Sequence, residues 1–154
     1  MPITLEQAWD FYSNHANLQT LTPAAMRFRI ISKDNAKYIC PGQVIEYKLS
    51  PVLGIPVYWK TEIPHVSAPT FFMDVQRKGP FRLWQHQHYF RAIEGGVEMT
   101  DILQYKNPLW LLGELANVLI VKRKLRTVFE FRFRKMEELF GVWPGGQEMK
   151  IELH

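Results

Sequence analysis

The chain has 154 residues, of which 47% are hydrophobic, 14% aromatic and 22% charged. This length and composition are typical of one globular domain with a single substantial core. Cys40 is the only cysteine, so neither an intramolecular disulfide nor a thiolate metal cluster can form. The net charge of +4 is unevenly placed, because seven basic residues and one acid, Glu130, lie between Lys122 and Lys135.

The N-terminal residues give no sign of a targeting segment. Met1 to Glu6 lack the basic and apolar regions of a signal peptide. No stretch reaches the roughly 18 apolar residues of a membrane span, and the best, residues 109–121, is interrupted by Gly113, Glu114 and Asn117. With a single cysteine, these features favour a soluble cytoplasmic protein.

Two short helices are expected near the N-terminus. Thr4 and Gln7 have the spacing of a capping box, which predicts a helix over residues 5–13. Asn14 is a second potential cap, and a short helix over residues 16–21 would end before Pro23.

Six strands are expected in the middle of the chain, where apolar and polar residues alternate with a period of two. They cover residues 26–30, 45–49, 57–63, 71–77, 83–91 and 97–106. Turn sequences separate several of them, namely Pro41-Gly42, Gly79-Pro80 and Gly95-Gly96. Short spacings of this kind predict an antiparallel meander with one buried face.

A long helix over residues 109–140 is expected to follow. Pro108 is suited to a helix start and Gly141 to a helix end. An apolar stripe includes Leu112, Leu115 and Leu119, and at 1.5 Å per residue the helix is about 48 Å long. The predicted fold class is therefore α+β, with a curved sheet of six or seven strands wrapped on a long C-terminal helix.

Several sequence stretches resemble one known superfamily. They include Leu18 to Pro23, Gly54 to Pro56 followed by Trp59-Lys60-Thr61, Phe72 to Gln76, Gly79 to His86, and Met99-Thr100-Asp101 with Tyr105. Over residues 3–140 the chain resembles the START, polyketide-cyclase and birch-pollen-allergen superfamily, also called SRPBCC or helix-grip. It is most similar to a bacterial branch of uncharacterised proteins, some labelled cell-division inhibitors or relatives of a small component of carbon monoxide dehydrogenase. The resemblance implies a cavity for hydrophobic molecules between sheet and long helix.

The ends of the chain depart from that pattern. The superfamily normally begins with a strand before the first helix, whereas Met1 lies almost at that helix. We predict a ligand-binding domain over residues 1–141 and a tail over residues 142–154. The tail is either flexible or, because Met149, Ile151 and Leu153 alternate, an added edge strand. Exchange of such a strand between two copies would give a homodimer.

Ionisable residues occur on faces that are otherwise apolar. His86 and His88 alternate with the same period as Trp84 and Phe90, and Asp101 shares a face with Met99 and Leu103. Asp74 and Gln76 could join them, although their strand is apolar on both faces. Four interpretations are open: a satisfied structural network, a polar anchor for a ligand, acid–base catalysis, and metal binding, which a single His-x-His supports least.

The sequence favours a binding protein over an enzyme and requires no cofactor and no metal. The expected ligand is a small hydrophobic molecule such as a lipid, quinone or polyketide. Its predicted site comprises Tyr47, Trp59, Asp74, Gln76, Trp84, His86, His88, Asp101, Tyr105, Leu112, Leu115 and Leu119. The alternative is a cyclase or dehydratase in which His86 or His88 works with Asp101.

The basic segment from Lys122 to Lys135 leads to a third hypothesis, an interaction module. A solvated helix face is the simplest interpretation, because cations favour the C-terminal half of a helix. An anionic membrane surface or an acidic protein is the next, and nucleic acid is the least favoured partner.

Overall fold

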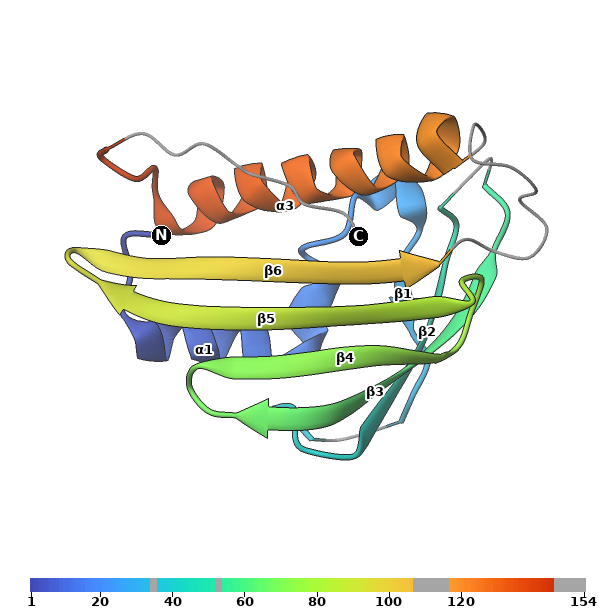
Figure 1. Cartoon of the computed structure of the whole chain (residues 1–154), viewed down its shortest axis with the longest axis horizontal. Helices are drawn as coiled ribbons and strands as arrows, with labels where there is room; N and C mark the ends of the chain where they lie inside the picture. The colour runs from blue at the N-terminus through green and yellow to red at the C-terminus, as the bar shows by residue number, and fades with distance from the viewer. Residues whose placement is uncertain (34–35, 52–53, 107–116, 146–154) are drawn as a thin grey trace.

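The computed structural model describes residues 1–33, 36–51, 54–106 and 117–145. Within these residues, six antiparallel strands form one sheet in the order β1-β2-β3-β4-β5-β6. Helix α1 lies behind the sheet and α3 runs beside β6 (Figure 1). The strands are β1 (Arg29–Ile30), β2 (Gln43–Leu49), β3 (Val57–Ser67), β4 (Phe71–Lys78), β5 (Leu83–Ile93) and β6 (Gly96–Lys106).

The first helix confirms the capping-box prediction. Helix α1 spans Leu5–Ser13, and the Thr4 hydroxyl accepts a hydrogen bond from the Gln7 amide while the Gln7 side chain accepts one from the Thr4 amide. Asn14 caps the next element, as expected, by accepting from the Ala16 amide. That element is a 3₁₀ helix, η1 (His15–Leu18), and is shorter than the predicted helix over residues 16–21.

The first strand is much shorter than its predicted range of 26–30. A second 3₁₀ helix, η2 (Ala24–Met26), takes the beginning of that range, and Arg27 follows it in the left-handed conformation with φ 48°. The Met26 carbonyl oxygen accepts from the Ser50 amide. Because of this local geometry, the pairing of β1 with β2 begins only at Arg29, which lies opposite Lys48.

The other five predicted strands are confirmed, with boundaries that differ by a few residues. Strand β3 continues four residues past Ile63 to Ser67, and its pairing with β4 shifts register between Glu62 and His65. Pro64 lies within this interval. Proline lacks an amide proton, so it is tolerated where a ladder is irregular.

The described part of the C-terminal helical segment consists of a stretch of π-helix, η3 (Asn117–Lys122), followed by α3 (Arg123–Phe140). It ends as predicted at Gly141, whose φ of 93° suits glycine. The predicted beginning of the helix over residues 109–116 lies outside the described residues, and so does the predicted tail strand from Met149. None of the helices in the described ranges has both the length and the apolar character needed to cross a bilayer.

The helices cover the inner, concave face of the sheet at two places. From α1, Ala8 is completely buried and the Trp9 ring meets those of Phe72 and Phe90 edge to face, at 6.1 and 6.0 Å between centroids. From the C-terminal segment, Val121 and Leu125 form a buried cluster with Leu103 and Tyr105 of β6. The space between these two contacts contains the candidate site.

The start of β6 is covered by the first residue of the chain. The Met1 amine donates to the Val97 carbonyl oxygen at 2.8 Å, and the Val97 amide donates to the Met1 carbonyl oxygen at 2.9 Å. Met1 is also buried in the main core. These two hydrogen bonds fix the N-terminal residue against the edge of β6 at Val97.

Candidate functional site: a cavity with a buried histidine–aspartate cluster

A cavity of about 740 Å³ lies between the inner face of the sheet and the helices. Ligand pockets usually have volumes of about 300–1,000 Å³. Most of its wall is apolar or aromatic, with contributions from strands β2 to β6, from α1 and η1, and from α3. The wall includes Phe11, Tyr12, Leu18, Leu21, Ile45, Tyr47, Ile63, Phe72, Trp84, Met99, Leu103, Phe129, Phe133 and Met136.

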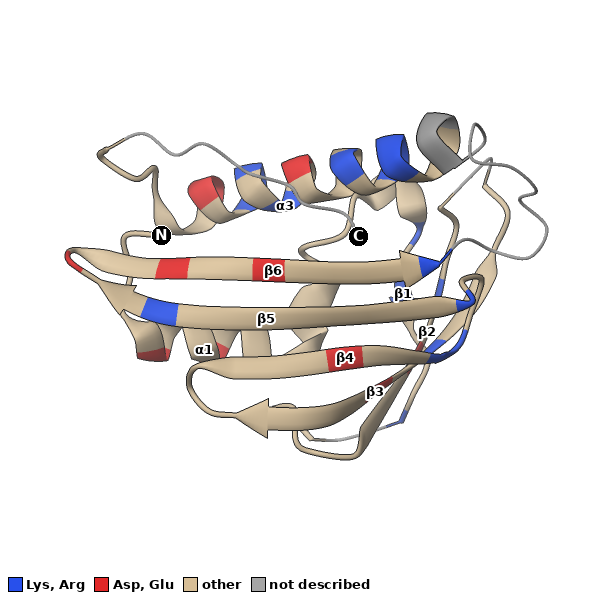
Figure 2. Ribbon diagram, in the orientation of Figure 1, with Lys and Arg blue, Asp and Glu red and all other residues tan. Residues whose placement is uncertain are grey.

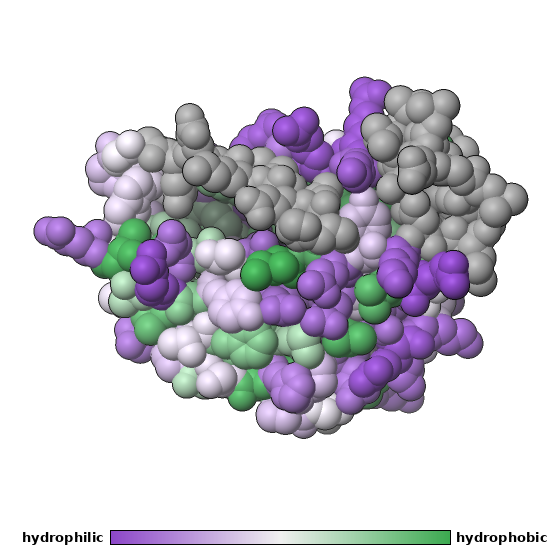
Figure 3. Space-filling model, in the orientation of Figure 1, coloured by the Kyte–Doolittle hydropathy of each residue, from purple (hydrophilic) through white to green (hydrophobic). Residues whose placement is uncertain are grey.

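The cavity reaches the outer edge of β6, the last strand of the described sheet. All six consecutive residues from Glu98 to Leu103 contribute to its wall, although neighbouring side chains of a strand point to opposite faces. The strand therefore lines the cavity with its edge as well as with its inner face. On the face seen in Figure 3, hydrophilic and hydrophobic residues are intermixed rather than gathered in one apolar patch.

Four ionisable side chains from three adjacent strands meet on the cavity wall. Asp74 of β4 is paired across the ladder with His86 of β5, and His88 is paired with Asp101 of β6. Directly paired residues have neighbouring side chains on the same face of a sheet. His86 and His88 are two residues apart, so all four side chains point inward together.

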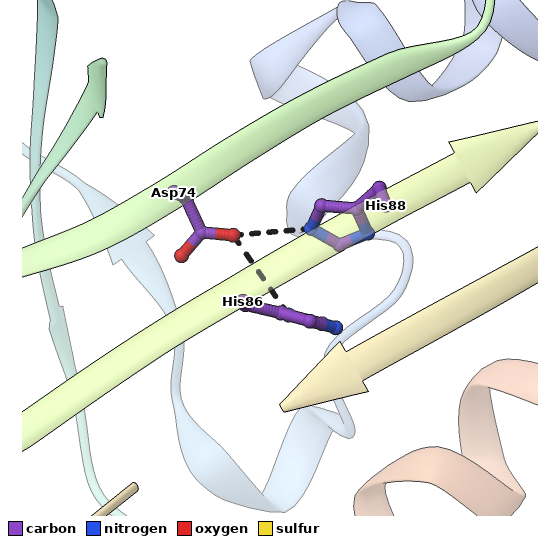
Figure 4. Close-up of side chains that lie close together, drawn as sticks. All are labelled: Asp74, His86 and His88. Carbon is purple, nitrogen blue, oxygen red and sulfur yellow. Dashed lines mark hydrogen bonds and ion pairs between the residues drawn. The ribbon is translucent and has the colours of Figure 1, made fainter. Parts of the chain in front are cut away.

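The four side chains form a compact arrangement in which each imidazole lies between the two carboxylates. Asp74 Oδ2 is 3.0 Å from His88 Nε2, with which it makes a hydrogen bond, and 3.8 Å from His86 Nδ1 (Figure 4). Asp101 Oδ1 is 2.6 Å from His88 Nδ1 and 3.1 Å from His86 Nε2. His86 and His88 are only 3% and 7% exposed, so bulk water screens these contacts little.

The surroundings move the pKa values of the two histidines apart. Burial lowers the pKa of His86, and the neighbouring charge of His88 lowers it further. Burial also acts to lower the pKa of His88, but the nearby carboxylates of Asp101 and Asp74 outweigh it and raise this pKa to about 9. Burial acts to raise the pKa of Asp101, yet both histidines hold it well below its usual range.

The cluster can therefore act in two chemical ways. At neutral pH, protonated His88 carries a positive charge and its two N–H groups face Asp74 and Asp101, whereas neutral His86 can accept a proton or a hydrogen bond. Two groups of one kind with divergent pKa values are typical of acid–base sites and also of buried ion-pair networks.

The cavity wall also contains two neutral tyrosines and one positively charged arginine. Burial raises the pKa values of Tyr12 and Tyr47, which keeps both phenols neutral. Tyr47 is within 3.2 Å of the Thr61 hydroxyl, with which it shares a hydrogen bond. Arg132 of α3 donates to the Leu21 carbonyl oxygen at 3.2 Å and adds a positive charge to the cavity wall.

Six of the residues expected at the site line the cavity, namely Tyr47, Asp74, Trp84, His86, His88 and Asp101. Trp59, Gln76 and Tyr105 do not line it. The Trp59 ring lies beside those of Tyr47 and Trp84, at 5.9 and 5.0 Å. The Gln76 amide donates to the Phe81 carbonyl oxygen at 2.6 Å, and Tyr105 packs with Val121 and Leu125. The side chains of Leu112, Leu115 and Leu119 lie outside the described part of the structure.

Sequence reasoning missed the cavity residues that come from the helices. Tyr12, Phe129, Arg132 and Met136 line the cavity from α1 and α3. Tyr12 and Met136 are apolar residues within the two predicted helices, and helical periodicity can mark such positions as buried but not as cavity residues. For Arg132, its position among the aromatic residues Phe129, Phe131 and Phe133 was the one available signal.

The remaining basic residues of the segment Lys122–Lys135 mostly lie on the outside of the helix (Figure 2). Lys122, Arg123, Lys124, Arg126 and Arg134 are exposed. Arg126 and Lys135 form ion pairs with Glu130 and Glu138, at 3.8 and 2.7 Å. A solvated helix face accounts for these contacts, and the membrane, acidic-protein and homodimer hypotheses stay predictions.

The class of protein that this architecture defines is the helix-grip fold, in which a curved antiparallel sheet and a C-terminal helix enclose a cavity. The fold aligns with protein TTHA0849 of Thermus thermophilus at a TM-score of 0.67 and 15% identity, over 90% of each chain. It aligns with a START superfamily protein of Mycobacterium smegmatis at 0.61 and 12% identity, again over 90% of each chain. For Ara h 8.0201 the TM-score is 0.56 and the identity 16%, over 88% of this chain and 92% of that one.

These alignments confirm the predicted α+β helix-grip fold. No family model matches the sequence, and no curated protein matches it. Any functional assignment must therefore rest on the cavity and its residues.

Proposed function

We propose that the protein binds a small, mostly apolar molecule in the cavity and orients its polar end with the histidine–aspartate cluster. The carrying observation is a cavity of about 740 Å³ whose largely apolar wall contains one compact group of ionisable residues. Binding sites for small molecules typically combine an apolar wall with a few placed polar groups. The helix-grip fold is consistent with this role but does not by itself identify the ligand.

The polar end of the ligand would meet groups of known hydrogen-bonding character. Neutral His86 can accept a hydrogen bond, and the neutral phenols of Tyr12 and Tyr47 can donate or accept one. A hydroxyl or carbonyl group on an otherwise apolar molecule suits this set. Lipids, quinones and polyketides with such groups remain the proposed ligand classes.

A cavity-filling variant tests this proposal. Met99 lines the cavity from β6, so Met99→Trp should occupy part of the volume that a ligand needs. Met73 lies on β4 outside the cavity wall, which makes Met73→Trp a matched control. Titration with anilinonaphthalene sulfonate, an apolar fluorescent probe, in the presence of a chelator should show saturable binding by the wild type that is at least tenfold weaker in Met99→Trp.

The control variant should bind the probe within about twofold of the wild type, because Met73 lies outside the cavity wall. A tenfold loss of affinity, by comparison, corresponds to about 1.4 kcal/mol of binding free energy. Equal affinities of the wild type and Met99→Trp would contradict the proposal, because the probe would then be bound elsewhere. Absence of saturable binding by the wild type would contradict it as well.

A further inference from the structure

In the histidine–aspartate cluster, one carboxylate oxygen and two imidazole nitrogens lie close together on the same side of the rings. Asp74 Oδ2 approaches one nitrogen of each imidazole, His88 Nε2 at 3.0 Å and His86 Nδ1 at 3.8 Å (Figure 4). One potential ligand atom from each of these three residues lies within 4.8 Å of the others. In a tetrahedral site with bonds of about 2.0–2.1 Å, ligand atoms are about 3.3 Å apart. The observed separations therefore bracket the spacing around a metal ion.

The second carboxylate lies on the opposite side of the same two rings. Asp101 Oδ1 approaches the other nitrogen of each imidazole, His86 Nε2 at 3.1 Å and His88 Nδ1 at 2.6 Å. Metal-binding histidines usually donate their second ring N–H to such a carboxylate, which fixes the tautomer and strengthens the ligand. Asp101 is placed to do this for both rings at once.

The burial and the missing hydrogen bonds of three atoms in the cluster also favour a bound ion. His86 Nε2, His88 Nδ1 and Asp101 Oδ1 are all buried, and among the described residues none of the three has a partner at a hydrogen-bonding angle. Buried polar atoms are costly when their bonds are not made. An ion on the Asp74 side would fix the planes of both rings, so that their opposite N–H groups could align with Asp101.

Charge balance supports a divalent ion in particular. Metal binding displaces the proton of His88 into solvent, and with both imidazoles then neutral, Asp74 and Asp101 together carry two negative charges at a site where His86 and His88 are at least nine-tenths buried. A divalent cation cancels them and leaves the four-residue cluster neutral. Both histidines also line the cavity, so further coordination positions would face the space in which a ligand or water binds.

We propose that Asp74, His86 and His88 bind a divalent first-row transition metal ion, such as Zn²⁺, with Asp101 holding both imidazoles from the other side. Two nitrogen ligands and one carboxylate with open positions suit Zn²⁺, Fe²⁺ and Co²⁺ rather than Ca²⁺ or Mg²⁺, which prefer oxygen ligands. This site goes beyond the proposed ligand binding, because the metal would bind without an apolar molecule.

Titration of chelator-treated protein with Co²⁺, followed by its visible absorption, tests the site, with Zn²⁺ used to displace the cobalt. The wild type should bind one ion per chain with a dissociation constant in the micromolar range or below. Asp74→Asn and His86→Gln should weaken binding at least 100-fold, and Asp101→Asn by roughly 10–100-fold. His65→Gln, which alters an exposed histidine of β3, should leave the affinity unchanged.

A measurement on the unaltered protein covers variants that fail to fold. Addition of Zn²⁺ should shift the imidazole nitrogen resonances of His86 and His88 and leave those of His15 and His65 in place. The proposal is overturned by a wild type that binds no Co²⁺ at tens of micromolar, by unchanged affinity in Asp74→Asn, or by shifts confined to other histidines. Because no apolar probe is present, failure here is distinct from failure of the proposed ligand binding.

Discussion

At the residue scale, the cluster depends on the alternation of side chains along three strands. Alternation correctly predicted that His86, His88 and Asp101 face inward, because their strand neighbours Phe90 and Leu103 are apolar. It left Asp74 ambiguous, since β4 carries large apolar residues on both faces. Only the register of β4 against β5 resolves this, by pairing Asp74 directly with His86.

The raised pKa of His88 makes its contribution to stability depend on pH. The pKa is about 9 in the folded protein and about 6.5 in an unfolded chain, so the folded state binds the proton more tightly. The resulting stabilisation, roughly 3 kcal/mol, is fully present below pH 6.5 and is lost as the pH rises through about 9. His88→Gln should remove it.

Urea unfolding of the wild type and His88→Gln at several pH values, in the presence of a chelator, measures this effect. The difference in unfolding free energy should be largest near pH 6 and should shrink towards pH 9.5. A difference that stays constant across this range would show that His88 is not preferentially protonated in the folded state. His65→Gln serves as the control for an exposed histidine.

At the element scale, long elements were easier to predict than short ones. The capping box placed α1 correctly, and alternation found β2 to β6 within a few residues. The region from His15 to Ile30 was predicted less well. It consists of two short 3₁₀ helices and a left-handed residue, Arg27, and such short elements have no periodic sequence pattern. Tertiary contacts decide such segments.

The orientation of the helices was the other missing information. A hydrophobic stripe shows that one side of a helix is buried, but it does not reveal which buried residues contact protein and which line a cavity. Arg132 illustrates this, since it reaches the cavity from a helix whose other basic residues are mostly exposed. Gln76 illustrates the reverse, because its side chain holds Phe81 rather than a ligand.

The turn between β5 and β6 makes a prediction about packing at the end of the sheet. A Cβ atom on Gly96 would lie 2.2 Å from the Met1 carbonyl oxygen and 2.6 Å from the Trp143 ring. Gly96→Ala should therefore destabilise the protein by roughly 1–3 kcal/mol, which exceeds the gain of about 0.4–1 kcal/mol from a less flexible unfolded chain. Thermal or urea unfolding measures the change, and an unaltered or increased stability would contradict the close packing.

At the scale of the whole molecule, ligand binding requires that the sheet and the helices do not close completely on one another. Helix α1 packs on one part of the concave face and the C-terminal segment on another, and between them the cavity remains. The ionisable cluster lies on the wall of this cavity rather than in the solid core. Such a hollow should accept apolar molecules up to a definite size and no further.

A calorimetric titration with straight-chain alcohols of increasing length measures this property most directly. Each added methylene group should strengthen binding by about 0.8 kcal/mol, or roughly fourfold, as long as it is buried. This gain should continue over several carbons and then stop, and it should stop at a shorter chain in Met99→Trp. No saturable binding at any length, or an identical limit in the wild type and Met99→Trp, would contradict the presence of a ligand-binding cavity.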